Sequence, residues 1–241
     1  VMLRVFPKLF LRLGGNPFKL LHDFWPEIKL VFQGGIPKLV LMAEFSADTD
    51  AEAENMAKQA EEAVRSFKVS THITKTQSEA EKFWTIRRES FKLLRENVAD
   101  KHTAPFIDDF VVSPKFLPEF LPRLYAILDE YKLIYTVAGH VGDGNFHIIP
   151  LMDFSRPDFV EIINDLSERV YSLVGEYHGS ITGEHNDGLI RTPYLHKMFD
   201  TEVLNVFQEI KEIFDPHRIF NPHKKVDPDP SYLRTAIKGG G

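Results

Sequence analysis

Apolar and polar positions along the chain follow the periods of strands and helices in turn, so the sequence predicts both element types. Residues 68–75 alternate apolar and polar side chains, as a half-buried strand does, and residues 38–45 predict a strand before it. Between them, Asp48 and Asp50 are capping-type residues that predict a helix over residues 50–66. The pattern therefore predicts a strand–helix–strand unit.

The remainder of the chain predicts further strands and helices. A strand is expected over residues 106–112, and the apolar runs 133–138 and 146–152 flank a tight turn that predicts a hairpin. The combination indicates an α+β fold with a largely antiparallel sheet, helices on one face, ferredoxin-like βαβ units and a helical C-terminal part. Four more helices are expected, over residues 78–98, 113–131 and 201–214 and between Pro157 and Gly179. Gly179 stands in the C-terminal cap position of the last of these.

Residues 1–36 differ in composition from the rest of the chain. They mix leucines and aromatics with glycine and proline breaks, and residues 1–38 carry six Lys/Arg against two Asp/Glu. We expect a strap that covers a partner domain, a subunit, an electron acceptor or a membrane face, with packing on the chain's own core as the alternative. Residues 37–228 would then be the folded domain, and residues 229–241 a flexible tail.

Composition restricts the chemistry. With 241 residues and 43% hydrophobic residues, the chain is long enough to bury a core. It has no cysteine, which excludes disulfides and thiolate chemistry and leaves His, Asp and Glu as metal ligands. No apolar run reaches the roughly 18–20 residues of a membrane span, so a cytoplasmic or membrane-peripheral protein is expected. Acidic residues outnumber basic ones, 35 to 29, which argues against nucleic acid as a partner.

Two histidines flank the predicted hairpin turn in the run His-Val-Gly-Asp-Gly-Asn-Phe-His, residues 140–147. If Asp143 and Gly144 form a two-residue loop, His140 and His147 lie directly opposite each other on neighbouring strands. Directly opposed Cβ atoms are roughly 4.5–5.5 Å apart, so both imidazoles could reach one metal ion. A structural hydrogen-bonding pair is the alternative reading of these two histidines.

A glycine-rich polar loop over residues 179–188 carries Glu184 and His185 at its centre. Two histidines and one carboxylate, with one position open, are the ligands of a catalytic zinc or a related divalent ion. The remaining histidine could then serve as an acid or a base.

Arg87 interrupts the apolar stripe of a long predicted helix. It lies four residues from both Phe83 and Phe91, which places it on the buried face. A buried charge is costly unless it is paired, so Arg87 needs an anionic partner. Asp108, Asp109 or a bound carboxylate substrate could each be that partner.

Three motifs together give the chain a resemblance to a known family. Gly139 to His147, Gly183-Glu-His185 and Phe214 to Pro222 resemble, in order and spacing, parts of the C-terminal half of FAD-linked oxidases. This group includes D-lactate dehydrogenases, the glycolate oxidase flavoprotein subunit and D-2-hydroxyglutarate dehydrogenase. The resemblance covers about residues 37–228.

The resemblance implies a role for each residue of the polar motifs. It implies a divalent ion, zinc by preference, on His140, His147 and Glu184. It places Asn145 near the substrate and makes His185 the residue that transfers the proton.

The resemblance also implies contacts with the substrate and the flavin. Arg87, in Trp-Thr-Ile-Arg, matches an arginine that holds the substrate carboxylate in related dehydrogenases, although a threonine and a lysine of some relatives are not evident here. Asn221 and Lys224 match residues near the flavin, although His223 replaces the glycine of the family's Asn-Pro-Gly-Lys segment.

The family's FAD lies in a separate N-terminal domain, and residues 1–8 resemble the end of that domain. The resemblance therefore implies a chain that oxidises a D-2-hydroxy acid only together with an N-terminal FAD-binding domain or a separate flavin subunit. Two other classes stay open: a metal-dependent hydrolase, and a non-catalytic binding or assembly module. A hydrolase gives no role to Arg87 or to the Asn-Pro motif, and a chain without bound metal would favour the module.

Overall fold

The protein is described by a computed structural model over residues 40–85, 87, 101–229, 232 and 236. The chain divides into two compact units between Val98 and Ala99, and each unit is treated by itself. The strap expected at residues 1–36 and most of the expected tail lie outside the described residues. Among the described residues, no helix combines the length and the apolar character that crossing a membrane requires.

The first unit contains helix α4 (Asp50–Val64) and the short helix η1 (Arg65–Phe67), and residues 77–85 and 87 are also helical. The helix predicted over 50–66 is confirmed, but its cap is Thr49 and not an aspartate. The Thr49 side chain accepts a hydrogen bond from the Glu52 backbone at 3.3 Å, and the Glu52 carboxylate accepts one from the Thr49 backbone at 3.2 Å. This reciprocal pair fixes where the helix begins.

The two strands predicted around α4 are wrong for the described residues. Residues 40–45 and 68–75 have no strand, and their apolar side chains Leu41 and Val69 are 70% and 56% exposed. Alternation becomes a strand only where a neighbouring strand takes up the backbone hydrogen bonds and one face is buried. Neither condition holds for these residues, so the periodic signal was not sufficient.

The second unit is built on a four-stranded antiparallel sheet, which confirms the expected α+β class. The central strand β4 (Asn145–Met152) pairs with β3 (Ile134–Ala138) along one edge. Along its other edge it pairs with β2 (Ile107–Val111) and then β1 (His102–Thr103). The strand predicted over 106–112 and the predicted hairpin are therefore confirmed.

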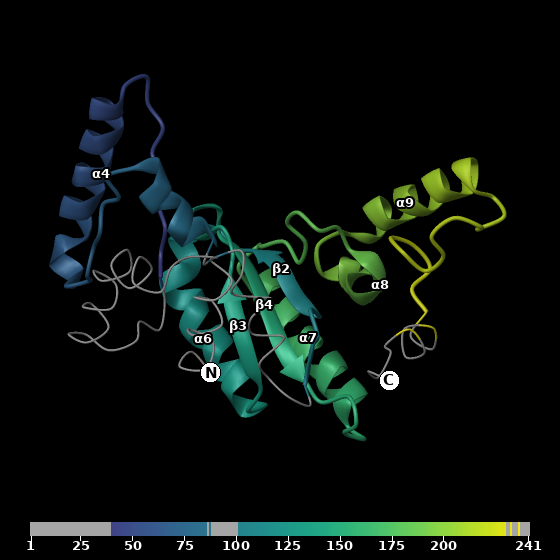
Figure 1. Ribbon diagram of the computed structural model, residues 1–241. Coiled ribbons are helices and arrows are strands. Elements are labelled where there is room, and N and C mark those ends of the chain that lie inside the picture. Colours follow the sequence, from purple (N-terminus) through teal and green to yellow (C-terminus); the bar gives the residue numbers. More distant parts are fainter. Residues whose placement is uncertain (1–39, 86, 88–100, 230–231, 233–235, 237–241) are drawn as a thin grey trace. The chain divides into compact units, whose positions relative to one another are not determined.

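Helices cover one face of this sheet (Figure 1). The helix predicted over residues 113–131 is confirmed as the short helix η2 (Pro114–Phe116) followed by α6 (Leu117–Glu130). Next along the chain after the hairpin, α7 (Phe159–Glu176) packs against α6 and β2. Burying one large apolar side chain stabilises the fold by about 1.5–3 kcal/mol. The core between sheet and helices includes Phe106, Phe110, Phe146, Ile148, Leu124, Leu128, Leu166 and Val170.

The end of α7 directs the following loop onto β2. His178 takes the left-handed conformation, with φ 53°, so the cap role expected of Gly179 belongs to His178. Gly179 is required for a different reason, because a Cβ there would lie 2.4 Å from the Val111 carbonyl oxygen. This close approach lets Ser180 and Val111 exchange backbone hydrogen bonds of 2.7 and 2.9 Å. The polar loop that follows is thereby placed at the end of β2.

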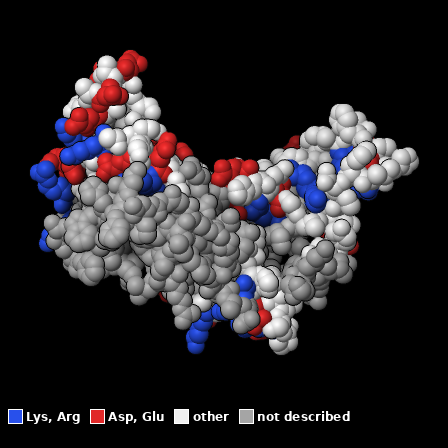
Figure 2. Space-filling view, viewed as in Figure 1, with Lys and Arg blue, Asp and Glu red and all other residues white. Residues whose placement is uncertain are grey.

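The C-terminal part is helical, as expected. It contains α8 (Gly188–Arg191), η4 (Thr192–Lys197) and α9 (Thr201–Phe214), and α9 matches its predicted bounds. Asp200 caps α9 by accepting a hydrogen bond from the Val203 backbone at 2.9 Å. Figure 2 shows the surface around α9 largely without charged side chains. Exposed apolar residues of α9 and the turn after it are Val206, Ile210, Ile213, Phe214, Ile219 and Phe220.

Candidate metal and proton-transfer site

The alternation of side chains along β4 places His147 on the sheet face opposite the helices. Phe146 and Ile148 belong to the core on the helix side, so His147 between them points to the other face. The loop after Ser180 reaches the same face and brings Glu184 and His185 to His147. Three of the four residues expected for metal binding and proton transfer are thus brought together.

The hairpin loop differs from the predicted two-residue turn. His147 pairs with Ala138 and not with His140, and residues Val141–Asp143 form one short helical turn, η3. The His140 carbonyl accepts hydrogen bonds from the backbone N–H groups of Asp143 and Asn145, at 2.9 and 3.2 Å. These bonds close a longer loop, which leaves His140 exposed with its ring centroid 6.5 Å from that of His147. The predicted direct opposition of the two histidines is therefore wrong.

A β-bulge in β2 changes the register beside His147. Asp108 pairs with His147, but Phe110 pairs with Phe146, so Asp109 is an extra residue. Asp109 has φ 65°, a left-handed conformation that aspartate adopts more readily than most residues. In a regular strand Asp108 and Asp109 would point to opposite faces, whereas here both carboxylates serve the same site.

Asp109 is fully buried and fixes the polar loop. Its carboxylate accepts hydrogen bonds from the backbone N–H groups of Gly183, Glu184 and His185, at 3.0, 3.1 and 2.8 Å, and from the Asn145 amide at 3.1 Å. Burial by itself would raise the pKa of Asp109, but these donors outweigh burial and hold the pKa below its ordinary value. The loop is therefore attached to the sheet by one charged side chain.

Glu184 lies beside the Nε2 atoms of both imidazoles. Its Oε1 is 2.8 Å from Nε2 of His147 and 3.8 Å from Nε2 of His185. The two rings are stacked, with centroids 4.9 Å apart and an interplanar angle of 15°. Hydrogen bonding to Asp108 is the largest influence on His147 and raises its pKa, with a further contribution from Glu184, although burial opposes both.

The donor atoms of this cluster are the kind that divalent transition metals prefer. Ligand atoms of Asp109, His147, Glu184 and His185 all lie within 4.8 Å of one another, so one ion could contact several of them. Both oxygens of Asp109 already accept N–H donors, which leaves the imidazoles and Glu184 as the groups able to bind an ion. The residues present therefore fit a divalent metal, while the expected contribution of His140 stays a prediction.

From the sequence, Asp108 and Asp109 in β2 are expected only as possible partners of Arg87. In the structure Asp108 contacts the two histidines, and Asp109 holds the loop that carries Glu184. The signal was present in the sequence, because two carboxylates inside an otherwise apolar strand must find partners when they are buried. What the sequence did not reveal is the bulge that turns both toward one face.

Arg87 lies in the first unit, where it is half-buried and its guanidinium carbon is 5.7 Å from the centroid of the Trp84 ring. Its expected contact with the substrate carboxylate stays a prediction.

Asn145 is buried, and its amide nitrogen donates to Asp109 while its amide oxygen has no partner among the described residues. Asn221 and Lys224 lie on the exposed turn after α9, and the Lys224 ammonium donates to the Asn221 amide oxygen at 3.3 Å. The predicted substrate contact of Asn145 and flavin contacts of Asn221 and Lys224 stay predictions.

Arg191 is a residue that sequence reasoning missed. It is buried, and its guanidinium donates to the backbone carbonyls of Asp108, at 2.9 Å, and Asn186, at 3.0 Å. These bonds tie the β2 bulge to the residue that follows His185. A single arginine at the end of the short helix α8 gave no sequence signal for this role.

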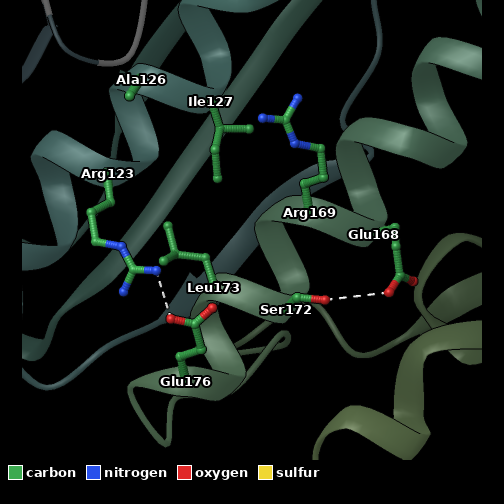
Figure 3. Close-up of a pocket in the computed structure, with 8 residues that line it drawn as sticks. All are labelled: Arg123, Ala126, Ile127, Glu168, Arg169, Ser172, Leu173 and Glu176. Carbon is green, nitrogen blue, oxygen red and sulfur yellow. Dashed lines mark hydrogen bonds and ion pairs between the residues drawn. The ribbon is translucent and has the colours of Figure 1, made fainter.

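A pocket of about 460 Å³ lies on the helix side of the unit, between α6 and α7, where arginines and glutamates surround Leu173 (Figure 3). Arg123 is paired with Glu176 at 2.6 Å, and Arg169 with Glu130 at 2.8 Å. The charges of both arginines are thus already balanced. The pocket is separate from the histidine cluster, because the sheet lies between them.

The sequence of this chain is similar to those of known proteins. Residues 37–225 match the family described as FAD linked oxidases, C-terminal domain. The chain is 34% identical over 145 residues to D-2-hydroxyglutarate dehydrogenase of Pseudomonas putida, covering 60% of this chain and 14% of that protein. It is 26% identical over 203 residues to the enzyme of the same name from Stutzerimonas stutzeri, covering 82% of this chain and 42% of that protein.

Glycolate oxidase subunit GlcD of Escherichia coli is also similar, with 28% identity over 158 residues that cover 65% of this chain and 31% of that protein. The chain thus spans less than half of the length of each of these relatives.

Proposed function

The chain belongs to the family of C-terminal domains of FAD-linked oxidases, and we propose that it is the substrate- and metal-binding part of a flavin-dependent dehydrogenase. The proposed reaction is oxidation of a D-2-hydroxy acid to the 2-oxo acid. An FAD-binding domain, on the same polypeptide or on a separate subunit, completes the enzyme. The metal-binding residues of this proposal are His147 and Glu184, with His140 as the third ligand.

The arrangement of His147, Glu184 and His185 is the observation that carries the proposal. Oxidation of a 2-hydroxy acid removes a proton from the hydroxyl and a hydride from the neighbouring carbon. The cluster combines groups able to bind a divalent ion with a histidine able to take a proton, within a few ångströms. The names of the similar proteins support the same substrate class.

Each side chain has a separate task in this proposal. When bound, a divalent ion acidifies the substrate hydroxyl, and the flavin of the partner domain accepts the hydride. His185 takes the hydroxyl proton at Nε2, since its Nδ1 faces Asp108 at 3.3 Å. Arg87 binds the substrate carboxylate, which restricts the orientation of the reacting carbon and raises the rate.

The surface of the C-terminal part supports a partner domain. α9 has no buried residue in the described structure, and Phe214 and Phe220 in and after it are 80% and 67% exposed. Contiguous exposed apolar surface of this kind is typical of an interface. We infer that the FAD-binding domain covers it, with Asn221 and Lys224 directed toward the flavin.

The function is tested by producing the chain together with an FAD-binding domain and loading the complex with zinc. D-2-hydroxyglutarate, glycolate and D-lactate are then added without oxygen, and loss of the oxidised flavin absorbance is followed. Flavin reduction by at least one acid is expected, and no reduction by any of them would refute the proposal.

His185→Asn should slow flavin reduction by about 10²–10⁴, the usual contribution of a general base. His196→Gln is the matched control, because this exposed histidine bonds only the Pro193 carbonyl in the described structure. Equal slowing by both substitutions would show that the assay reports folding and not proton transfer.

A further inference from the structure

One carboxylate contacts both histidines of the cluster. Oδ1 of Asp108 accepts a hydrogen bond from Nδ1 of His147 at 3.0 Å, and Oδ2 of Asp108 lies 3.3 Å from Nδ1 of His185. The Asp108 side chain is only 8% exposed. Each of its oxygens is therefore assigned to a different ring, in a place where water cannot easily substitute.

The fold makes this sharing possible through two independent elements. Asp108 and His147 are register partners on β2 and β4, which brings their side chains together on one face. His185 arrives from the loop that Asp109 holds, and its ring stacks on that of His147. The strand pair and the anchored loop thus converge on the same carboxylate.

The arrangement favours one nitrogen of each ring as the carrier of the proton. An ionised carboxylate accepts hydrogen bonds but cannot donate them, so Asp108 favours a hydrogen on Nδ1 of each neutral imidazole. Glu184 competes for the hydrogen of His147 from the Nε2 side, but its side chain is 49% exposed against 8% for Asp108, so water replaces Glu184 more easily as a partner. Both Nε2 atoms then present a lone pair. These Nε2 atoms are the ones near Glu184, at 2.8 and 3.8 Å, on the side where an ion and a substrate would bind.

We propose that Asp108 is a positioning residue that sets the same tautomer in His147 and His185. In His147 this presents Nε2 as a metal ligand, and in His185 it presents Nε2 as the proton acceptor. Asp108 also faces the positive charge that His185 gains when it takes a proton. The inference rests on the proposed function for its purpose, but the tautomers themselves can be tested without flavin or substrate.

The test is nitrogen-15 NMR of the histidine rings in the metal-free full chain, in alkaline buffer where the rings are neutral. Two-bond nitrogen–proton couplings distinguish the two tautomers directly. Both His147 and His185 are expected with hydrogen on Nδ1. A wild-type chain with hydrogen on Nε2 of either ring would overturn the proposal, whether or not the chain supports flavin reduction.

Substitutions give a second readout. Asp108→Asn offers one acceptor and one donor, so one ring must change its tautomer, and zinc affinity should fall by about 10–100-fold. Asp108→Glu keeps two acceptors and should preserve both tautomers and most of the affinity. Asp129→Asn is the control, because Asp129 is exposed on α6. Unchanged tautomers and affinity in Asp108→Asn would contradict the proposed role.

Failure of the proposed function has a different signature from failure of this inference. A chain with both Nδ1–H tautomers and no flavin reduction would retain the role of Asp108 and refute the dehydrogenase. Flavin reduction by a chain whose rings carry hydrogen on Nε2 would support the dehydrogenase and refute the role of Asp108.

Discussion

Replacing Asp109 by asparagine removes the charge that holds the Glu184 loop while keeping the shape of the side chain. Asparagine also tolerates the left-handed backbone of this position, φ 65°, so the substitution tests the charge and not the backbone. Four donor groups point at the Asp109 carboxylate: three loop N–H groups and the Asn145 amide. With the amide oxygen in the place of Oδ2, the three loop bonds persist without the charge, and the bond at Oδ1 from the Asn145 amide is lost.

The size of the effect follows from the strength of hydrogen bonds to charged groups. A bond to a charged group contributes about 1.5–3 kcal/mol and a neutral one about 0.5–1.5 kcal/mol, so weakening three bonds and losing one removes about 4–7 kcal/mol. The neutral side chain avoids part of the desolvation cost of a buried charge, which reduces the expected net loss to about 3 kcal/mol. That is a large share of the roughly 5–15 kcal/mol by which domains are stable.

Urea unfolding of the wild type, Asp109→Asn and the exposed control Asp129→Asn measures this loss. Relative to the wild type, hydrogen exchange at the amides of residues 183–185 should be faster in Asp109→Asn and unchanged in Asp129→Asn. A loss below about 1 kcal/mol, together with unchanged exchange at these amides, would refute the anchoring role of Asp109.

Two further predictions concern the cluster and the loop that leads to it. Glu184→Gln should weaken zinc binding by more than about 100-fold in calorimetric titration, whereas Glu176→Gln, far from the cluster, should not. Gly179→Ala should lower the free energy of unfolding by about 1–3 kcal/mol, because its Cβ would lie 2.4 Å from the Val111 carbonyl oxygen, and urea unfolding measures this.

The hydrogen bond from Lys211 is the main reason why the pKa of Asp215 is lowered to about 2. The ionised carboxylate therefore stabilises the folded chain fully above the unfolded pKa of about 4, and this stabilisation disappears as the pH falls toward 2. The difference in melting temperature between wild type and Asp215→Asn should therefore be largest above pH 4 and should disappear near pH 2. A difference that stays constant over this range would exclude the carboxylate as its cause.

The sequence predicted those features that depend on local patterns. Helical periodicity located α6, α7 and α9, and the glycine-rich hairpin signal located β3 and β4. The polar motifs also pointed to His147, Glu184 and His185, which the structure brings together.

The predictions that were wrong concern features that depend on contacts between distant segments. Residues 40–45 and 68–75 have strand character but no partner strand in the described structure. The Asp-Gly pair suggested a two-residue turn, yet Val141–Asp143 form a helical turn and the loop is longer. Gly144 after it has no room for a side chain, because a Cβ there would lie 1.8 Å from the Val112 carbonyl oxygen. The anchoring role of Asp109 required the bulge at that residue, which no local pattern indicates.

X-ray absorption of zinc bound to the full chain tests the central claim most directly, because it reports the ligands around the ion. One zinc per chain is expected, with nitrogen and oxygen neighbours at about 2.0–2.1 Å and the outer-shell scattering of imidazole rings. His147→Ala should remove one imidazole from this pattern. Zinc that fails to bind stoichiometrically, or that binds with an oxygen-only shell, would contradict the assignment of this cluster as the metal site.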